Sequence, residues 1–466
     1  MIGSGTLTRT LAGRLAQTGY DALDADAIRV TKEHILYTLG TVLAGSSAPG
    51  ATEILTAARS LGAAAESTAL VSGEKLPAAT AALVNATMVH SRELDINDDR
   101  IAYKSSVAAI PAALALAEKS SGISGREFIA AVCLGVDLGI RLGLAINPKP
   151  AHAQAIALGP LAAAVSCAKI LRLDESGLMD ALGAAYCRVS FTGNSTVSPS
   201  LTKRLGIGFA SHSGVVAAQI AAAGFPGAGE LFQGPGGFYN FFFREDGDYE
   251  LILDQFGQRF EIVQVGPKPY PSCRYTHPAV TGVLSIIDER SVAPDDIEEV
   301  RVYIGERDMR SVGGWTEAEK QKKHRPQGIV DAQFSIPFTV AATLVNRRLS
   351  LEEFTDANLR NEEILALADR VTPVLDRELD HGPMDVKPKI IEIVTRNGEC
   401  LRQRVDYPKG NPKNPVTSDE LVESFRVMAG YSARPLTHAK IDEAIDFILQ
   451  LETKQDASMM TRFLVA

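Results

Sequence analysis

Residues 268–279 read KPYPSCRYTHPA, and the composition of the chain changes at this stretch. Proline fixes φ and lacks a backbone N–H, so these residues form neither a helix interior nor a central strand. The stretch carries Lys268, Arg274 and His277 close together. We interpret it as a rigid loop at a domain junction, which is a favoured place for a ligand pocket. A linker whose tyrosines and prolines pack on both domains is the alternative.

The chain before this loop is rich in alanine and glycine, and its apolar residues recur at helical spacing from Leu7 to about Gly224. Segments that are apolar nearly all round predict helices buried on most sides. The abundant small residues predict close contacts between these helices. The clearest predicted helical segments are 24–45, 105–118, 124–146, 159–186 (two helices broken near Asp174) and 211–225.

The chain after the loop mixes two patterns. β-Branched residues in rough alternation predict strands at 297–306 and 389–407, the second a hairpin turning at Asn397-Gly398. Segments 331–350, 361–372 and 438–452 look helical. We therefore predict a mainly α protein. It has a large all-α domain (1–265), completed by a C-terminal helix at about 430–466, and a smaller α+β domain (266–429).

The charge and the cysteines narrow the possible functions. The 466 residues carry a formal net charge of −9, which argues against nucleic acid or an anionic membrane as a partner. Five scattered cysteines without CxxC spacing indicate reduced thiols in a cytoplasmic protein. We expect no signal peptide and no transmembrane span. Without HxH, HExxH or a dinucleotide-binding glycine pattern, we expect no metal and no cofactor.

Residues 89–106, VHSRELDINDDRIAYKSS, gather four acids (Glu93, Asp95, Asp98 and Asp99) ahead of Lys104. Taken alone, the segment is best explained as a charged loop that caps the next helix. A lysine and two serines just before a buried helix also suit an anion site, because a helix start offers free N–H groups.

Three further positions are candidates with structural alternatives. His152 precedes an Ala-rich helix, and a lone histidine is more often a cap or a core residue than a catalyst. Lys203 and Arg204 follow a polar loop, and the sequence is explained equally well by a binding role and by exposed basic residues at a helix start. The glycine-spaced run after them lacks the preceding strand and the lysine of a phosphate loop. Together the basic residues suit a small, multiply charged anion.

Five segments resemble, in order, motifs of the MmgE/PrpD family: HSRELDINDD (90–99), HAQAIALGPLAAAVSCAKILRL (152–173), LTKRLGIGFASHSGVVAAQIAAAGFPG (201–227), KPYPSCRYTHPAV (268–280) and DAQFSIPFTVAATLV (331–345). This family includes 2-methylcitrate dehydratase, cis-aconitate decarboxylase and iminodisuccinate epimerase. The resemblance implies that the smaller domain is a lid and that the protein is a homodimer. It also implies cofactor-independent chemistry on a small polycarboxylate, in a site between the domains.

By this resemblance, Asp95, His152, Lys203, Lys268 and His277 fall on positions implicated in the family's site. We expect catalysis to involve Asp95, Lys104, His152, Lys203 and His277. Lys268, Tyr270, Arg204 and Arg274 are then expected to bind the substrate. The chain departs from the family pattern at three places. Lys104 stands where a His-Pro-Ser or His-Pro-Gly motif is common, Asp95-Ile96-Asn97 replaces an Asp-Asp-Thr run, and Gly206 replaces a histidine. These departures favour a substrate other than methylcitrate.

The predicted activity is that of a lyase, a dehydratase or decarboxylase resembling 2-methylcitrate dehydratase, that acts α or β to a carboxylate. A base would remove a proton, or CO₂ would leave, while cations hold the developing charge. Two groups flanking one carbon would instead give an epimerase or other isomerase. A homologue that binds polycarboxylates without catalysis is the alternative from another class. A metal-dependent hydrolase is a weaker alternative, which activity in a chelator would eliminate.

Overall fold

The computed structural model describes residues 6–101, 103–146, 154–190 and 201–466. The chain folds into two compact units. The larger unit comprises Met1–Ser91, Asp95–Pro267 and Thr417–Ala466, and the smaller unit comprises Arg92–Leu94 and Lys268–Val416. The sequence places the two domain boundaries at 265/266 and 429/430, so the second boundary lies about a helix earlier in the structure.

The larger unit is built mainly of α-helices, as the composition predicts. Its helices are α1 (Leu7–Gln17), α2 (Ala25–Gly45), α3 (Ala51–Ala58), α4 (Ala78–Val89), α5 (Ala109–Ser120), α6 (Gly125–Leu144), α7 (Gln154–Ile170), α8 (Glu175–Tyr186), α10 (Thr202–Ala222), α11 (Phe238–Phe243), α12 (Tyr249–Leu253), α19 (Ser418–Gly430) and α20 (His438–Leu449). An antiparallel pair, β1 (Ser67–Ala69) and β2 (Glu74–Leu76), corrects the all-α prediction. These three-residue strands are too short to give an alternating pattern in the sequence.

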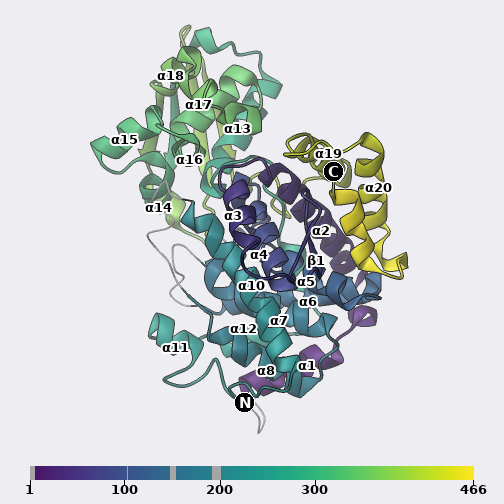
Figure 1. Ribbon diagram of the computed structural model, residues 1–466. Helices are drawn as coiled ribbons and strands as arrows, with labels where there is room; N and C mark the ends of the chain where they lie inside the picture. Colours follow the sequence, from purple (N-terminus) through teal and green to yellow (C-terminus); the bar gives the residue numbers. More distant parts are fainter. Residues whose placement is uncertain (1–5, 102, 147–153, 191–200) are drawn as a thin grey trace. The chain divides into compact units, whose positions relative to one another are not determined.

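The core of this unit forms where α10 crosses α7, with α4, α5, α6 and α8 around them (Figure 1). Small residues let the helix backbones approach closely. A Cβ added at Gly214 of α10 would lie 2.3 Å from the Ala163 Cβ of α7, and one at Gly208 would lie 2.8 Å from the Leu83 carbonyl of α4. The abundance of alanine and glycine therefore serves helix packing, as predicted.

Polar residues fix where the main helices begin. The Asp24 side chain accepts from the Ala27 N–H at the start of α2, and Ser124 and Glu127 form a reciprocal capping box on α6. Helix α10 begins at Thr202 rather than at the predicted residue 211. The glycine-spaced run is the first part of this helix, because Gly206 and Gly208 face neighbouring helices rather than turning the chain.

Helix α10 is also long and apolar enough to cross a membrane by length and hydropathy alone. More than half of its apolar window is buried inside the larger unit, against α4, α7 and α8. Its packing in the core accounts for its apolar composition.

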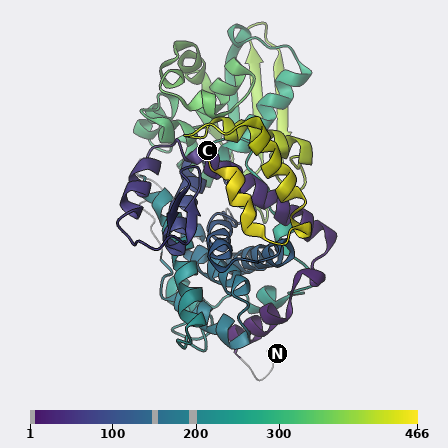
Figure 2. The same ribbon diagram turned by 45° about the vertical axis from the view of Figure 1, so that its right-hand side comes forward.

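The C-terminal segment returns to the larger unit as two helices. Helix α19 packs along α2, where the fully buried Phe425 ring lies beside Gly40. Helix α20 also contacts α2, and the 3₁₀ segment Ala457–Leu464 contacts α5. Both yellow helices lie beside α2 in Figures 1 and 2. Helix α19 is absent from the elements that the sequence predicts, and α20 is expected at 438–452.

The smaller unit contains a four-stranded sheet of order β4-β3-β5-β6. Its strands are β3 (Ile297–Ile304), β4 (Val371–Leu375), β5 (Lys389–Thr395) and β6 (Cys400–Val405), with β3–β4 parallel and the other pairs antiparallel. The hairpin β5–β6 turns at Gly398, whose φ of 88° suits glycine. Helix α13 (His277–Glu289) packs against β5 and β6, and α17 (Ile336–Asn346) against β4. Figure 2 shows the strands as arrows beside the green helices of this unit.

Further helices complete the smaller unit: α14 (Glu306–Asp308), α15 (Glu317–His324), α16 (Ile329–Gln333) and α18 (Glu362–Ala368). Two predictions in this unit need correction. The predicted helix 331–350 is two helices, because the Ser335 side chain caps α17 and Pro337 lies in its first turn. The end of the predicted helix 361–372 is strand β4, whose Val371 pairs with Val300.

Candidate active site

The loop after α4 places a buried carboxylate next to a buried imidazole. The His90 Nδ1 lies 2.8 Å from the Asp95 Oδ1, and both side chains are almost fully buried. Because a carboxylate only accepts, the imidazole N–H donates. Backbone bridges fix the loop beyond Asp95: Asn97 pairs with Gly266, and Asp98 pairs with Tyr103. The loop thus presents Asp95 in one held conformation within the larger unit.

The remaining acids of this loop in the larger unit have structural contacts. Asp98 accepts one hydrogen bond from the Arg100 backbone N–H and two from its guanidinium, whose Nη1 lies 2.6 Å from Glu261. Burial raises the pKa of Asp98, although the Arg100 guanidinium opposes that shift. Asp99 accepts from the Asn97 Nδ2 at 3.0 Å. Asp98 and Asp99 therefore hold the loop through contacts within it, whereas Asp95 contacts His90.

Lys104, Ser105 and Ser106 lie just before α5, as the sequence predicts. Lys104 is half-buried, and both serines are buried. The Ser106 hydroxyl lies 3.1 Å from the His34 Nδ1, and the His34 Nε2 lies 3.3 Å from the Val265 carbonyl. Burial lowers the pKa of His34 to about 4, so at neutral pH its uncharged ring donates from Nε2 and accepts from Ser106. A neutral imidazole thus ties the segment before α5 to residue 265.

The other basic candidates of the larger unit lie at the start of α10. Lys203 and Arg204 are both half-buried there, and the Arg204 Nη1 donates to the Pro49 carbonyl at 3.0 Å. His152 lies outside the described residues. Gly206, which replaces a family histidine, faces α7, since an added Cβ would lie 2.7 Å from the Ile156 Cδ1. A larger side chain at that position would displace Ile156.

In the smaller unit, Lys268 is completely buried beside Glu93. Its Nζ lies 3.2 Å from the Glu93 Oε2 and 3.3 Å from the Ser272 carbonyl. Glu93 adopts a φ of 56°, a left-handed backbone conformation that residues other than glycine rarely take. Burying an ammonium group is costly unless it is paired, so this contact makes the buried Lys268 tolerable.

Arg274 and His277 form the second half of this cluster. The Arg274 Nη1 donates to the His277 Nδ1 at 3.0 Å and to the Lys409 carbonyl at 2.9 Å, and the His277 Nε2 lies 3.3 Å from the Ser272 carbonyl. Burial, Arg274 and Lys268 hold the pKa of His277 well below its usual value. The ring is therefore neutral with its proton on Nε2. The Tyr270 ring packs 5.0 Å from the imidazole, centre to centre.

The MmgE/PrpD N-terminal domain matches residues 9–250, and the MmgE/PrpD C-terminal domain matches residues 270–449. The chain belongs to the MmgE/PrpD family. This confirms the resemblance seen in the five sequence segments.

Curated relatives of this MmgE/PrpD protein share about a quarter of its residues. The cis-aconitate decarboxylase of Aspergillus terreus is 25% identical over 95% of this chain and 93% of its own length. The human cis-aconitate decarboxylase is 25% identical over 84% of this chain and 80% of its own length. The cis-aconitate decarboxylase-like protein oryM of Aspergillus oryzae is 24% identical over 97% of this chain and 96% of its own length.

Sequence reasoning missed the partners that hold the candidate residues in this MmgE/PrpD protein. His90 stands out only as the first residue of a motif, and Glu93 only as one of four acids without a role of its own. His34 lies in the middle of a predicted buried helix, 72 positions from Ser106. A polar residue inside an apolar helix was the available signal for His34, but spacing alone could not identify its partner.

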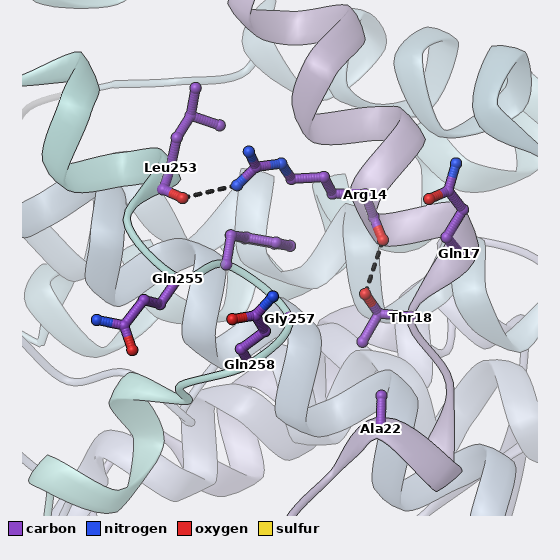
Figure 3. A pocket seen from close by; sticks show the side chains of 9 residues that line it. Arg14, Gln17, Thr18, Ala22, Leu253, Gln255, Gly257 and Gln258 are labelled. Atoms are coloured by element: carbon purple, nitrogen blue, oxygen red, sulfur yellow. Dashed lines mark hydrogen bonds between the residues drawn. The ribbon is translucent and has the colours of Figure 1, made fainter.

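A polar pocket of about 500 Å³ lies elsewhere in the larger unit, between α1 and the turn after α12. In Figure 3 the Arg14 guanidinium reaches from α1 to the Leu253 carbonyl, 2.6 Å away. None of the predicted site residues lines this pocket. Its lining residues are Arg14, Gln17, Thr18, Ala22, Leu253, Gln255, Phe256, Gly257 and Gln258.

Proposed function

We propose that this protein is a cofactor-independent lyase that acts α or β to a carboxylate of a small polycarboxylic acid. The buried cluster of Lys268, Arg274 and His277 carries this proposal. Its two basic side chains, Lys268 and Arg274, lie in a chain whose net charge is −9, and an arginine and a lysine together suit a carboxylate ligand. Relatives named as cis-aconitate decarboxylases, similar along most of the chain, support the same class of substrate.

We assign the two cations to the carboxylates of the substrate. An arginine binds a carboxylate with paired N–H donors, and a lysine supplies a compact charge. His277 is then a positioning residue rather than a proton donor, because its Nδ1 is hydrogen-bonded to Arg274 and its Nε2 to the Ser272 carbonyl. This revises the catalytic role expected for His277 from the sequence.

We assign Asp95 to proton transfer, with Lys104, Lys203 and His152 as further candidates. In dehydration, a base takes the proton from the carbon next to a carboxylate, a C=C bond forms, and the neighbouring hydroxyl leaves with a proton as water. In decarboxylation, the C–C bond to a carboxylate breaks, CO₂ leaves, and the carbon takes up a proton. Both reactions place negative charge on a remaining carboxylate, where fixed cations are most effective.

Proton NMR in D₂O tests the proposal directly. The purified protein is incubated with cis-aconitate, citrate, 2-methylcitrate, iminodisuccinate and tartrate. New vinylic signals from a saturated acid indicate dehydration, and loss of CO₂ with a new product indicates decarboxylation. Exchange of an α-proton without net product would identify an epimerase instead. No change with any acid would overturn the proposal and favour a protein that binds polycarboxylates without catalysis.

A further inference from the structure

Gln333, the last residue of α16, is attached at both ends to the loop that carries Lys268 and His277. Its backbone carbonyl accepts from the Cys273 N–H at 2.8 Å. Its side-chain Nε2 donates to the Pro271 carbonyl at 2.9 Å and to the Arg92 carbonyl at 3.3 Å. Residue 272 lies between these two attachment points, and its carbonyl contacts both the Lys268 Nζ and the His277 Nε2. The carboxamide therefore belongs to the cationic cluster of the smaller unit.

The two carbonyl acceptors fix the orientation of this carboxamide. A flipped amide would place two oxygens against carbonyl oxygens, so the Nε2 must face Pro271 and Arg92. The Oε1 then points elsewhere as an acceptor. Within the described part of the chain it has no hydrogen-bond partner, although Gln333 is 2% exposed. Buried polar atoms are nearly always hydrogen-bonded, so we expect the Gln333 Oε1 to accept from a donor outside the chain, either water or a ligand.

The charges nearby decide what kind of donor this is. Carboxylates accept only, so the acid groups of a polycarboxylate cannot satisfy the Gln333 Oε1. An ammonium group would donate, but Lys268 and Arg274 on the same loop would repel it. A neutral hydroxyl group donates without adding charge.

We infer that Gln333 is a specificity-determining residue whose Oε1 accepts a hydrogen bond from a hydroxyl group of the ligand. This inference rests on the proposed function, and it narrows the substrate to a hydroxy-polycarboxylate.

Paired ligands test the inference on the unaltered protein. Citrate and tricarballylate have the same tricarboxylate skeleton, and only citrate has the hydroxyl group. We expect isothermal titration calorimetry to give a dissociation constant about tenfold lower for citrate, the range of one net hydrogen bond. Malate, succinate and aspartate form a second series, in which malate should bind most tightly. Tighter binding of aspartate would overturn the choice of hydroxyl over ammonium.

Variants assign the preference to one side chain. Gln333→Met keeps the length of the side chain and removes the acceptor. The dissociation constants of citrate and tricarballylate should then become equal, a ratio of about one. Gln333→Glu keeps an oxygen acceptor but adds a negative charge, so both ligands should bind more weakly while the ratio of their dissociation constants is retained. This variant tests the inference even if Gln333→Met is unstable. Gln327→Met is the control, because Gln327 is exposed in the same unit.

The outcomes separate the two proposals. If neither tricarboxylate nor any dicarboxylate binds, the proposed function itself fails. If citrate and tricarballylate bind equally to the unaltered protein, the polycarboxylate function stands, and water rather than the ligand satisfies Gln333. A preference that persists in Gln333→Met, or that disappears in Gln333→Glu, would place the hydroxyl recognition at another residue.

Discussion

The contact between His90 and Asp95 allows a residue-level test with little structural change. Asp95→Asn keeps an oxygen that can accept from the His90 Nδ1–H, so the loop should stay folded. We expect turnover to fall at least about a hundredfold, the usual effect of losing a proton-transfer group. Rates from the NMR assay and the thermal unfolding midpoint provide the measurement. Asp26→Asn, at an exposed ion pair on α2, is the control, and full activity of Asp95→Asn would exclude Asp95 from catalysis.

His34 should make the larger unit sensitive to acid. Its pKa of about 4 in the folded protein lies below the value of about 6.5 in the unfolded chain, so the unfolded chain binds the proton more readily. The free energy of unfolding should therefore fall as the pH drops from about 6.5 to 4, by on the order of 3 kcal/mol. Urea unfolding at pH 7 and pH 4.5 measures this loss. The loss should be smaller in His34→Gln, and an equal loss in both proteins would contradict the assignment.

At the scale of residues, the sequence indicated the candidates but not their partners. Lys268, Arg274 and His277 stand in one short loop, and all three lie in the buried cluster. The pairing of Lys268 with Glu93 depends on a fold that brings together residues 175 positions apart. The neutral state of His277 likewise follows from burial and from Arg274, which no spacing rule shows.

At the scale of elements, the crossing of α10 and α7 depends on glycine. Gly214→Ala gains helix propensity, but its Cβ would lie 2.7–2.8 Å from backbone atoms of Ala163 and Ala164. We expect a net loss of about 1–3 kcal/mol in the free energy of unfolding, because packed backbones cannot move aside easily. Gly430→Ala, at the end of α19 with no atom within 4 Å, should be neutral or stabilising by up to about 1 kcal/mol. Equal effects in urea unfolding would rule out steric packing as the reason for Gly214.

Buried helices were easier to predict than their ends. The predicted helix 24–45 coincides with α2 and its Asp24 cap. It could be predicted because both the capping acid and the apolar periodicity are visible in a short stretch of sequence. The predicted start of α10 is nine residues late, since glycines that serve packing look like glycines that serve a turn. Strand β4 was missed because its pairing with β3 joins residues about 70 positions apart.

At the scale of the whole molecule, residues 417–466 should be essential to the larger unit. They include α19 and α20, which contact α2 and carry the buried Phe425, Ile445 and Ile448 side chains. A chain ending at Val416 would expose that apolar surface, so we expect it to lose helical circular dichroism and become sensitive to protease. Peptides from 268–416 should remain the most resistant. Phe425→Ala should also destabilise the larger unit, by about 3–5 kcal/mol in the free energy of unfolding. A truncated chain with unchanged helicity would show that α2 does not need this cover.

The order of segments in the chain has a consequence for biosynthesis. Residues 268–416 separate the first part of the larger unit from α19 and α20, which complete it. A ribosome adding about 5–20 residues per second needs roughly 10–40 s to pass from Lys268 to Ala466. During that interval the apolar side of α2 lacks its cover, while the chain of the smaller unit is being completed. The larger unit therefore cannot complete its core until translation has passed through the smaller unit.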